Sequence, residues 1–301
     1  MTHADFYMEG MIRRIQREGY KDINPRPKYA DGAPAHTISV NHIFRSYDLS
    51  RGDFPICTLR PQAWKTGIRE IFTIYQKPTN DIATMHDMGV TWWDEWDIGD
   101  GTIGQRYGAT VSRYDLINNL IKDIQNDPYG RRKIVSLWQE QDLHETPGLA
   151  PCAFLTIWNV RNDNHKHLGR GEGYLDMMLV QRSGDMLTAS GPGGINEIQY
   201  AALLMMIARH TGYKPGVFSH VVANEQIYDR HMDAAKEMLE RFDAKMEAES
   251  NAAATALDWS PILPKLVLNP KVQNFYDMTI DDFAMENYEP MKPQLKLELG
   301  I

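Results

Sequence analysis

The chain has 301 residues, of which 43% are hydrophobic, and this is enough for a substantial core within one domain. Its formal net charge of -8 and pI near 5.7 argue against a general nucleic-acid surface, which needs a basic stripe. Two cysteines, Cys57 and Cys152, are too few for a disulfide framework, and the N-terminus lacks the regions of a signal peptide. We therefore expect a reducing, cytoplasmic setting and no membrane span, since the longest strongly apolar run covers only 201–208.

Apolar residues at helical spacing predict helices at 3–18, 62–76, 115–126, 196–211 and 228–246. Runs rich in β-branched and aromatic residues predict strands at 133–138, 153–160, 174–181 and 217–222. The two kinds of element are interleaved without the regular spacing of a doubly wound fold, which favours a mixed α+β layer structure in a single domain, 1–301. The Ala- and acid-rich segment 243–258 is expected to be a surface insertion.

Cys152 is the candidate nucleophile. It follows a proline, between a glycine-containing turn and a predicted strand. Arg131 and Arg132 precede it, and Arg182 ends the strand expected beside its own. Guanidinium charge lowers the pKa of a thiol and favours the thiolate, which is the form that attacks. Cys57 is expected to be a small buried side chain, as most free cysteines are.

Several arginines have the composition of a phosphate site. Arg131 and Arg132 are adjacent, Arg182 precedes Ser183, and Arg26 stands alone in a proline-rich stretch. Planar guanidinium groups match phosphate oxygens in pairs, so these residues predict a phosphate clamp. Surface arginines in ordinary ion pairs explain the same pattern, and the sequence does not decide between the two.

Three further features suit a site for a flat ligand. Glu70 lies within an apolar helical pattern, where burial would raise its pKa and allow proton exchange near neutrality; a helix-surface position is the alternative. The three tryptophans of 89–96 and Tyr107 offer a stacking wall, or simply core. Segment 190–194 lacks the lysine of a phosphate loop and is interpreted as a turn.

Ten segments together resemble one family in their order and spacing. They are PRPKYADGAPAHT (25–37), DFPICTLRPQAWKTGIREI (53–71), GVTWWDEW (89–96), DGTIGQRYG (100–108), GRRKI (130–134), APC (150–152), QRSGD (181–185), INEIQY (195–200), QIYDRH (226–231) and NPKVQNFYDMTIDDF (269–283). From about residue 5 to its end, apart from 243–258, the chain resembles thymidylate synthase and the related pyrimidine nucleotide hydroxymethylases.

The resemblance implies a mixed sheet layered with helices and a homodimer formed through one sheet face. It implies that Cys152 adds to C6 of a pyrimidine ring, that 5,10-methylenetetrahydrofolate is the co-substrate, and that no metal takes part. Arg131 and Arg132 would reach the partner subunit's phosphate site. The other implied roles are phosphate binding by Arg26, Arg182 and Ser183, proton handling by Glu70, contacts in the folate and catalytic cavity by Trp93, Tyr107 and Asp185, base reading by Asn196, and sugar binding by Gln226 and Tyr228.

The chemistry of uracil agrees with these roles. C5 of uracil is a poor nucleophile until a thiolate adds to C6, because the addition creates an enolate whose charge spreads over O4 and C5. Such activation needs one thiolate, donors at O4 and a base for the C5 proton. Cys152, Asn196 with ordered water, and Glu70 or a water near Tyr107 would supply them.

The sequence departs from the family pattern around the nucleotide. Segment 188–196 appears three residues longer than the usual Gly-x-Pro-Phe-Asn, and Ile195 stands in place of Phe. Gln226 replaces the usual His of the sugar motif, and 223–224 (Ala-Asn) replaces its Gly-Asp. We therefore expect retained covalent chemistry with an altered substrate or product.

The departures favour a pyrimidine nucleoside monophosphate hydroxymethylase. Asn196 favours dUMP, because an amide can offer a donor and an acceptor to uracil, whereas a carboxylate from Glu197 would suit the amino group of cytosine. Reductive methylation to dTMP is the alternative, and hydroxymethylation of dCMP or CMP is a further one. Outside the family, a methyltransferase using S-adenosylmethionine would need a glycine-rich strand-to-helix turn that the chain lacks. A non-catalytic nucleotide-binding protein is the other candidate.

Overall fold

The structure is a computed structural model that describes residues 1–162, 173–255, 260 and 262–300. Its α-helices are α1 (His3–Glu18), α2 (Trp64–Ile71), α3 (Ile82–Asp87), α4 (Gly108–Arg113), α5 (Leu116–Asn126), α6 (Glu140–Glu145), α7 (Ile195–Thr211) and α8 (Met232–Thr255). Its strands are β1 (Tyr20–Lys21), β2 (Thr37–Asp48), β3 (Ile134–Ser136), β4 (Ala153–Asn162), β5 (Gly173–Gln181), β6 (Gly184–Asp185), β7 (Lys214–Tyr228), β8 (Lys265–Leu268) and β9 (Phe283–Glu286). Two π-helical turns, Phe72–Gln76 and Met186–Ser190, follow α2 and β6.

A mixed sheet forms the centre of the fold, with strand order β1-β2-β7-β5-β4-β3 and β6 paired to β7. β2 and β7 run antiparallel, β7 and β5 parallel, and β5 and β4 antiparallel. β8 and β9 form a separate antiparallel pair. The predicted α+β class is therefore confirmed.

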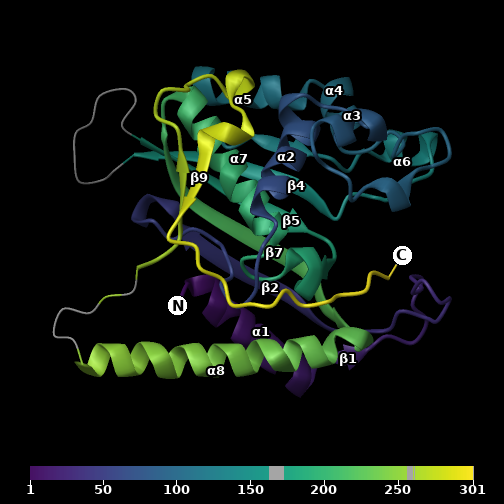
Figure 1. Ribbon diagram of the computed structural model, residues 1–301. Coiled ribbons are helices and arrows are strands. Elements are labelled where there is room, and N and C mark those ends of the chain that lie inside the picture. Colours follow the sequence, from purple (N-terminus) through teal and green to yellow (C-terminus); the bar gives the residue numbers. More distant parts are fainter. Residues whose placement is uncertain (163–172, 256–259, 261, 301) are drawn as a thin grey trace.

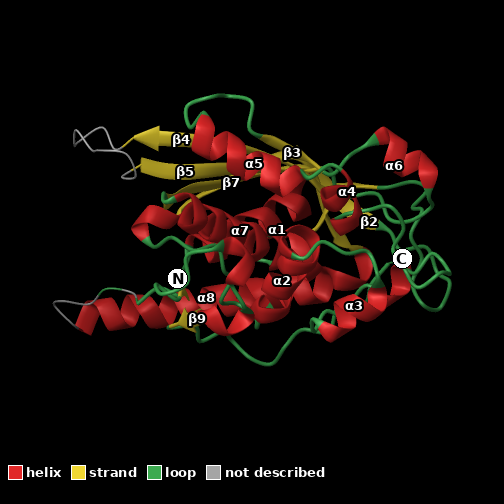
Figure 2. Cartoon of the chain, turned by 90° about the horizontal axis from the view of Figure 1, so that it is seen from above, coloured by secondary structure: helices red, strands yellow, loops and turns green. Residues whose placement is uncertain are grey.

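Helices cover one face of this sheet (Figure 2). α7 contacts β5 and β7, α1 contacts β2, and α2 packs on α7. α8 runs beside α1 along the lower edge in Figure 1. Because α7 lies between the sheet and α2, most of its side chains are buried, which explains why its sequence is apolar on nearly every side.

The opposite face of the sheet carries a band of apolar side chains. Phe44 is paired with Val221, Val221 with Val180, and Val180 with Leu155, so these four residues form one row across β2, β7, β5 and β4. Phe44 is 59% exposed, and the other three are partly exposed. Apolar rows that no helix covers are typical of sheets that meet another surface.

Sequence patterns located most of the regular structure. Predicted helix 3–18 is α1, and the predicted strands coincide with β3, β4, β5 and part of β7. The sequence analysis missed β2, because its inward face carries Thr37, Ser39 and Arg45 and so hides the apolar alternation. Residues 243–255 belong to α8, and 256–258 lie outside the described residues.

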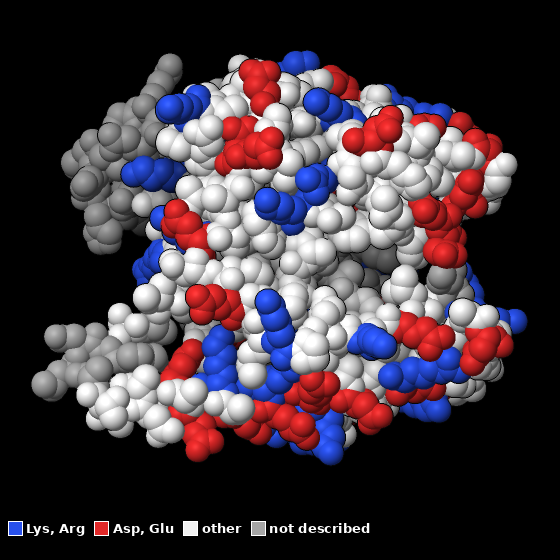
Figure 3. All heavy atoms as spheres, in the orientation of Figure 1, with Lys and Arg blue, Asp and Glu red and all other residues white. Residues whose placement is uncertain are grey.

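Charges of both signs are interspersed over the face seen in Figure 3, including the side of α8. No single basic stripe crosses that face, as the acidic net charge of the chain led us to expect. Across the described part of the chain, no helix combines the length and apolarity needed to cross a bilayer. The same residues contain no group of three or more His, Cys, Asp or Glu side chains placed to hold a metal ion.

Candidate active site

One cavity of about 970 Å³ gathers most of the predicted site residues where β5, β6 and β7 end. Its lining includes the candidates for covalent and proton chemistry and for base reading, which are Glu70, Tyr107, Cys152 and Asn196. It also includes the phosphate candidates Arg26, Arg182 and Ser183. The remaining lining candidates are Trp93, Asp185, Gln226 and Tyr228. Eleven of the thirteen residues proposed from the sequence therefore share one cavity, although no sequence spacing required it.

Cys152 stands at the start of β4, where Arg182 fixes the turn before it. Arg182 donates from Nε to the carbonyl of Pro151 at 3.0 Å and from Nη2 to that of Ala150 at 2.7 Å. The same Nη2 lies 3.5 Å from Cys152 Sγ. Burial raises the pKa of the Cys152 thiol, while the charges of Arg182 and Arg26 oppose that rise. The arginine charge acts on the thiol in the direction expected from the sequence, but burial outweighs it and the pKa of Cys152 is raised.

Glu70 is buried against α7, and not on the helix surface. α2 approaches α7 closely at Gly67, where a Cβ would lie 3.3 Å from Ile195 Cγ2. Glu70 Oε1 accepts hydrogen bonds from the indole nitrogens of Trp92 at 3.0 Å and Trp93 at 2.5 Å. Burial raises the pKa of Glu70, and the three hydrogen bonds that the carboxylate receives act against this rise. A carboxyl group in this state suits proton exchange near neutrality.

Tyr107 joins the carboxylate side of the cavity to the cysteine side. Its hydroxyl accepts a hydrogen bond from the backbone N–H of Cys152 at 3.3 Å, and its ring packs edge-on against Trp93 at 5.0 Å. Its backbone has φ 47° and ψ -108°, a conformation that non-glycine residues rarely adopt. Strain of this kind persists where the surroundings hold a residue in a functional position.

Asp185 offers an unused acceptor in the cavity. Its Oδ2 accepts a hydrogen bond from the Thr188 hydroxyl, whereas its buried Oδ1 has no partner among the described residues. Burial raises the pKa of Asp185. A buried oxygen without a partner is costly unless a ligand donates to it, so Asp185 is suited to a ligand that carries N–H groups.

Arg131 and Arg132 are the two candidates that lie outside this cavity. Both are exposed and precede β3, whose Ile134 is 53% exposed. Ile134 pairs with Ile157, and Ile157 with Met178, in a second row across the uncovered sheet face. The two arginines therefore lie beside the apolar face and away from the phosphate candidates of their own chain.

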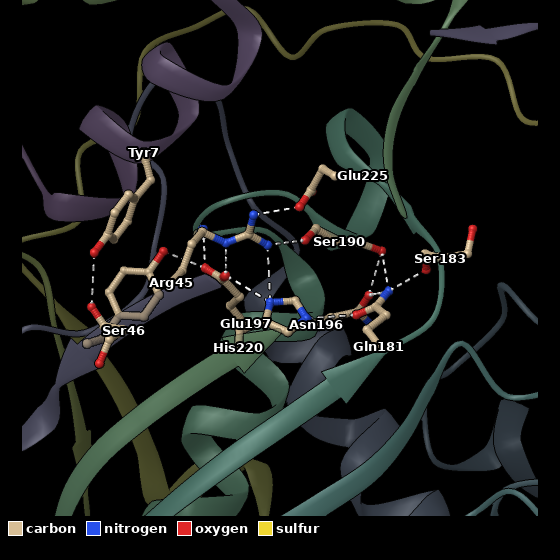
Figure 4. A network of polar contacts seen from close by, with 12 residues as sticks. Tyr7, Arg45, Ser46, Gln181, Ser183, Ser190, Asn196, Glu197, His220 and Glu225 are labelled. Carbon is tan, nitrogen blue, oxygen red and sulfur yellow. Dashed lines mark hydrogen bonds and ion pairs between the residues drawn. The ribbon is translucent and has the colours of Figure 1, made fainter. Parts of the chain in front are cut away.

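Sequence reasoning missed a buried polar cluster behind the cavity (Figure 4). Arg45 from β2 is only 1% exposed, and its guanidinium nitrogens lie 2.6 Å from carboxyl oxygens of both Glu197 of α7 and Glu225 of β7. Glu197 also accepts from the hydroxyl of Tyr47 at 2.6 Å and from the backbone N–H of Gly193 at 2.7 Å. Glu197 is 0% exposed and cannot meet a cytosine amino group in this arrangement, so that hypothesis is wrong.

The sequence contained one indication of this buried cluster. An arginine in a strand and two glutamates in otherwise apolar elements are costly unless they pair, and these three residues are separated widely in the sequence. Burial raises the pKa of Glu225 to about 7, whereas the charge of Arg45 and hydrogen bonds from His220 and Tyr47 overcome burial and lower the pKa of Glu197 to about 2. One carboxylate therefore neutralises Arg45, and the other holds a proton up to neutral pH.

The pKa of Glu225 predicts how stability depends on pH. The native state keeps a proton on Glu225 between pH 4.5 and 7 that the unfolded chain releases, so this group lowers the free energy of unfolding as pH rises through that window. Glu225→Gln keeps an acceptor for Arg45 and removes the titration. We expect the stability of the variant relative to wild type to increase from pH 5 to pH 8, by on the order of 3 kcal/mol. Urea unfolding at several pH values measures this difference, and a difference independent of pH would contradict the assignment.

Comparisons with known proteins point to one family. The sequence model described as thymidylate synthase matches residues 6–301. The chain is 44% identical over 304 residues to the thymidylate synthase of Streptococcus agalactiae serotype Ia, and 44% identical over 303 residues to that of Lactococcus lactis subsp. cremoris. Both alignments cover 100% of each chain. Thermostable thymidylate synthase A from Bacillus subtilis has a similar structure, with a TM-score of 0.82, 31% sequence identity and full coverage of both chains.

Proposed function

Because this chain belongs to the thymidylate synthase family, we propose that it makes dTMP by reductive methylation of dUMP. The chain is a one-carbon transferase, and 5,10-methylenetetrahydrofolate is its co-substrate. The observation that carries the proposal is the cavity in which Cys152, Glu70 and Asn196 meet. The preference for 5-hydroxymethylation has no support, since the relatives named above are thymidylate synthases.

Each step of the proposed reaction has a residue in the cavity. The Cys152 thiolate forms a bond to C6 of uracil, and the electron pair of the C5–C6 double bond moves onto C5 and O4. Asn196 donates a hydrogen bond to O4, where negative charge develops. Glu70 manages the proton that leaves C5, directly or through a water near Tyr107. C5 would bond to the methylene carbon supplied by the folate, and the tetrahydrofolate nitrogen would leave that carbon once the C5 proton is lost. Addition of the folate's hydride to the exocyclic carbon would then give the methyl group, restore the C5–C6 double bond and release Cys152 from C6 as its thiolate.

The phosphate and the sugar are assigned to the cysteine side of the cavity. Arg26, Arg182 and Ser183 would bind the phosphate, and its negative charge would offset the two guanidinium charges there. We assign the sugar hydroxyl to Tyr228 and Gln226, which lie two residues apart on the same face of β7 and line the cavity. Tyr228 is largely buried, so its hydroxyl is held in a fixed position.

The tryptophan side of the cavity fits a reduced folate. Trp92, Trp93 and Trp96 line it and give a flat apolar wall for a fused ring, and the unpaired Oδ1 of Asp185 suits the N–H groups of that ring. When bound, the folate supplies both the methylene carbon and the hydride. The C-terminal residues Leu299 and Gly300 also line the cavity, and they would help to exclude water there. Exclusion of water favours methylation over hydroxymethylation.

We propose that two subunits complete each site. The apolar rows on the uncovered sheet face provide a self-complementary surface for a homodimer with twofold symmetry. Arg131 and Arg132 lie beside this face and away from the cavity of their own chain. We therefore assign them to the partner subunit's phosphate site, where their charges would add to those of Arg26 and Arg182.

Incubation with nucleotide and 5,10-methylenetetrahydrofolate, followed by mass analysis of the nucleotide, tests the product and the substrate together. We expect dUMP to gain one CH2 unit while dihydrofolate forms, and dCMP, UMP and CMP to react far more slowly. A gain of CH2O with release of tetrahydrofolate would show hydroxymethylation instead. Conversion of none of the four nucleotides by folded protein would remove the proposed function.

A further inference from the structure

Arg106 comes immediately before Tyr107, and its side chain holds the C-terminal end of α6. Arg106 is only 3% exposed. Its Nη1 donates to the carbonyl of Asp142, and its Nη2 donates to the carbonyls of Leu143 at 3.3 Å and Thr146 at 2.7 Å. Carbonyls at the end of a helix lack partners within the helix, so a buried guanidinium group that meets three of them fixes where α6 ends.

The end of α6 leads directly to the nucleophile. Only five residues separate Thr146 from Cys152, and part of this segment lines the cavity. The same segment packs closely on the chain just before Arg106. The Thr146 hydroxyl oxygen accepts from the backbone N–H of Gln105 at 2.7 Å, and a Cβ at Gly104 would lie only 2.7 Å from that oxygen. Arg106 therefore lies where the segment that carries Cys152 meets the segment that carries the catalytic tyrosine.

Arg106 also fixes the backbone beside Tyr107. The N–H of Arg106 donates to the carbonyl of Gly104 at 2.8 Å, and its carbonyl accepts from the N–H of Ala109 at 3.0 Å. The positive φ of Tyr107, 47°, is unfavourable for a residue with a side chain and persists only while its surroundings are held. Relaxation of this φ would carry the Tyr107 hydroxyl away from the backbone N–H of Cys152, from which it accepts at 3.3 Å.

We propose that Arg106 is a positioning residue that holds the Tyr107 hydroxyl and the Cys152 thiol in their reactive arrangement. The inference rests on the proposed function and deepens it. Among the described residues that line the cavity, Tyr107 is present and Arg106 is absent, so Arg106 acts on the reaction only through the residues that it holds. Without its guanidinium group, the end of α6 and the turn at Tyr107 are free to shift relative to each other.

A second arginine separates positioning from simple stabilisation of α6. Arg113 Nη1 lies 2.8 Å from Asp142 Oδ1, and its two terminal nitrogens bond to the Glu145 carboxylate at 2.6 and 2.8 Å. These contacts reach side chains of α6, whereas Arg106 binds the backbone that leads to Cys152. If stabilising α6 were the whole role of Arg106, loss of either arginine would affect the reaction equally.

Arg106→Ala and Arg113→Ala are compared by steady-state kinetics with dUMP and 5,10-methylenetetrahydrofolate, and by calorimetry with dUMP alone. In Arg106→Ala, we expect kcat for dTMP formation to fall about 100-fold, because a displacement of about 1 Å is enough for such a loss. The dissociation constant for dUMP should stay near wild type. In Arg113→Ala, kcat should stay near wild type, with any loss confined to stability. Equal losses of kcat in the two variants, or an unchanged kcat in folded Arg106→Ala, would overturn the proposal.

A double variant tests whether Arg106 acts through the tyrosine hydroxyl. Tyr107→Phe keeps the ring and removes the group that meets Cys152. We expect Arg106→Ala to reduce kcat about tenfold less in the Tyr107→Phe protein than in the wild-type protein, because the interaction that it positions is already lost. Losses that multiply independently would contradict this role.

Thermal unfolding shows whether each variant folds. If Arg106→Ala does not fold, Arg106→Lys takes its place, because an ammonium group keeps the buried charge but lacks the planar fork that meets separate carbonyls. We expect a loss of about tenfold in kcat in that variant, and an unchanged kcat would overturn the proposal. A wild-type protein that makes no dTMP would remove the proposed function, whereas an active wild type with an equally active Arg106 variant would remove only this inference.

Discussion

Cys152→Ser is expected to reduce kcat/KM for dTMP formation by about 10³-fold or more, because a serine hydroxyl is scarcely ionised near neutral pH and is a far weaker nucleophile than a thiolate. Nucleotide binding should persist, since the phosphate candidates Arg26 and Arg182 are unchanged. Steady-state kinetics and calorimetry with dUMP give the two quantities.

The second cysteine supplies a matched control for this experiment. Cys57 is 0% exposed and packs in the core, and burial raises the pKa of its thiol strongly. Cys57→Ala should therefore keep most of the activity of the wild-type protein, with a loss confined to stability. Activity retained in Cys152→Ser would rule out Cys152 as the nucleophile. Activity lost in Cys57→Ala but not in Cys152→Ser would assign the nucleophile to Cys57 instead.

Heterodimers that combine two inactive chains are expected to recover about half of the activity of a wild-type dimer. One chain carries Cys152→Ala, and the other carries Arg131→Ala with Arg132→Ala. If the arginines act across the interface, the heterodimer contains one complete site, formed by Cys152 of one chain and the two arginines of the other. Its second site lacks the cysteine and the two arginines. Co-expression with two different affinity tags yields the pure heterodimer for kinetic measurement.

The opposite assignment of the arginines gives a different result. If Arg131 and Arg132 served the site of their own chain, neither site of the heterodimer would be complete, and no activity would return. The matched control replaces Arg13 and Arg14, another adjacent pair, which lie on the surface of α1. That double variant should leave the activity near wild type. Inactive heterodimers of normal stability would therefore contradict the assignment across the interface.

The sequence predicted the types of residue at the site better than their electrostatic state. Cys152, Glu70 and Asn196 share the cavity, and Glu70 has the raised pKa that its apolar helix suggested. The net effect on Cys152 could not be predicted, because it depends on how deeply the thiol is buried and on where Arg182 stands relative to it. Burial of this kind is a property of the assembled cavity.

The buried polar cluster around Arg45 could not be predicted from the sequence, for a related reason. Arg45, Gln181 and His220 lie on three strands that are distant in sequence, and β2 itself was missed because its buried face is polar. Glu197 was interpreted as a possible base reader, whereas Arg45 holds it away from the cavity. Only the pairing of β2 with β7 brings these charges together.

The central claim is that the sulfur of Cys152 bonds to C6 of the pyrimidine while carbon is transferred to C5. A 5-fluoro analogue of dUMP tests it directly, because fluorine cannot leave as the C5 proton does and the covalent complex should accumulate. After incubation with this analogue and 5,10-methylenetetrahydrofolate, mass spectrometry of the denatured, digested protein should find the nucleotide and folate together on the peptide that contains Cys152. A protein that forms dTMP from dUMP yet carries no adduct on that peptide would contradict the account.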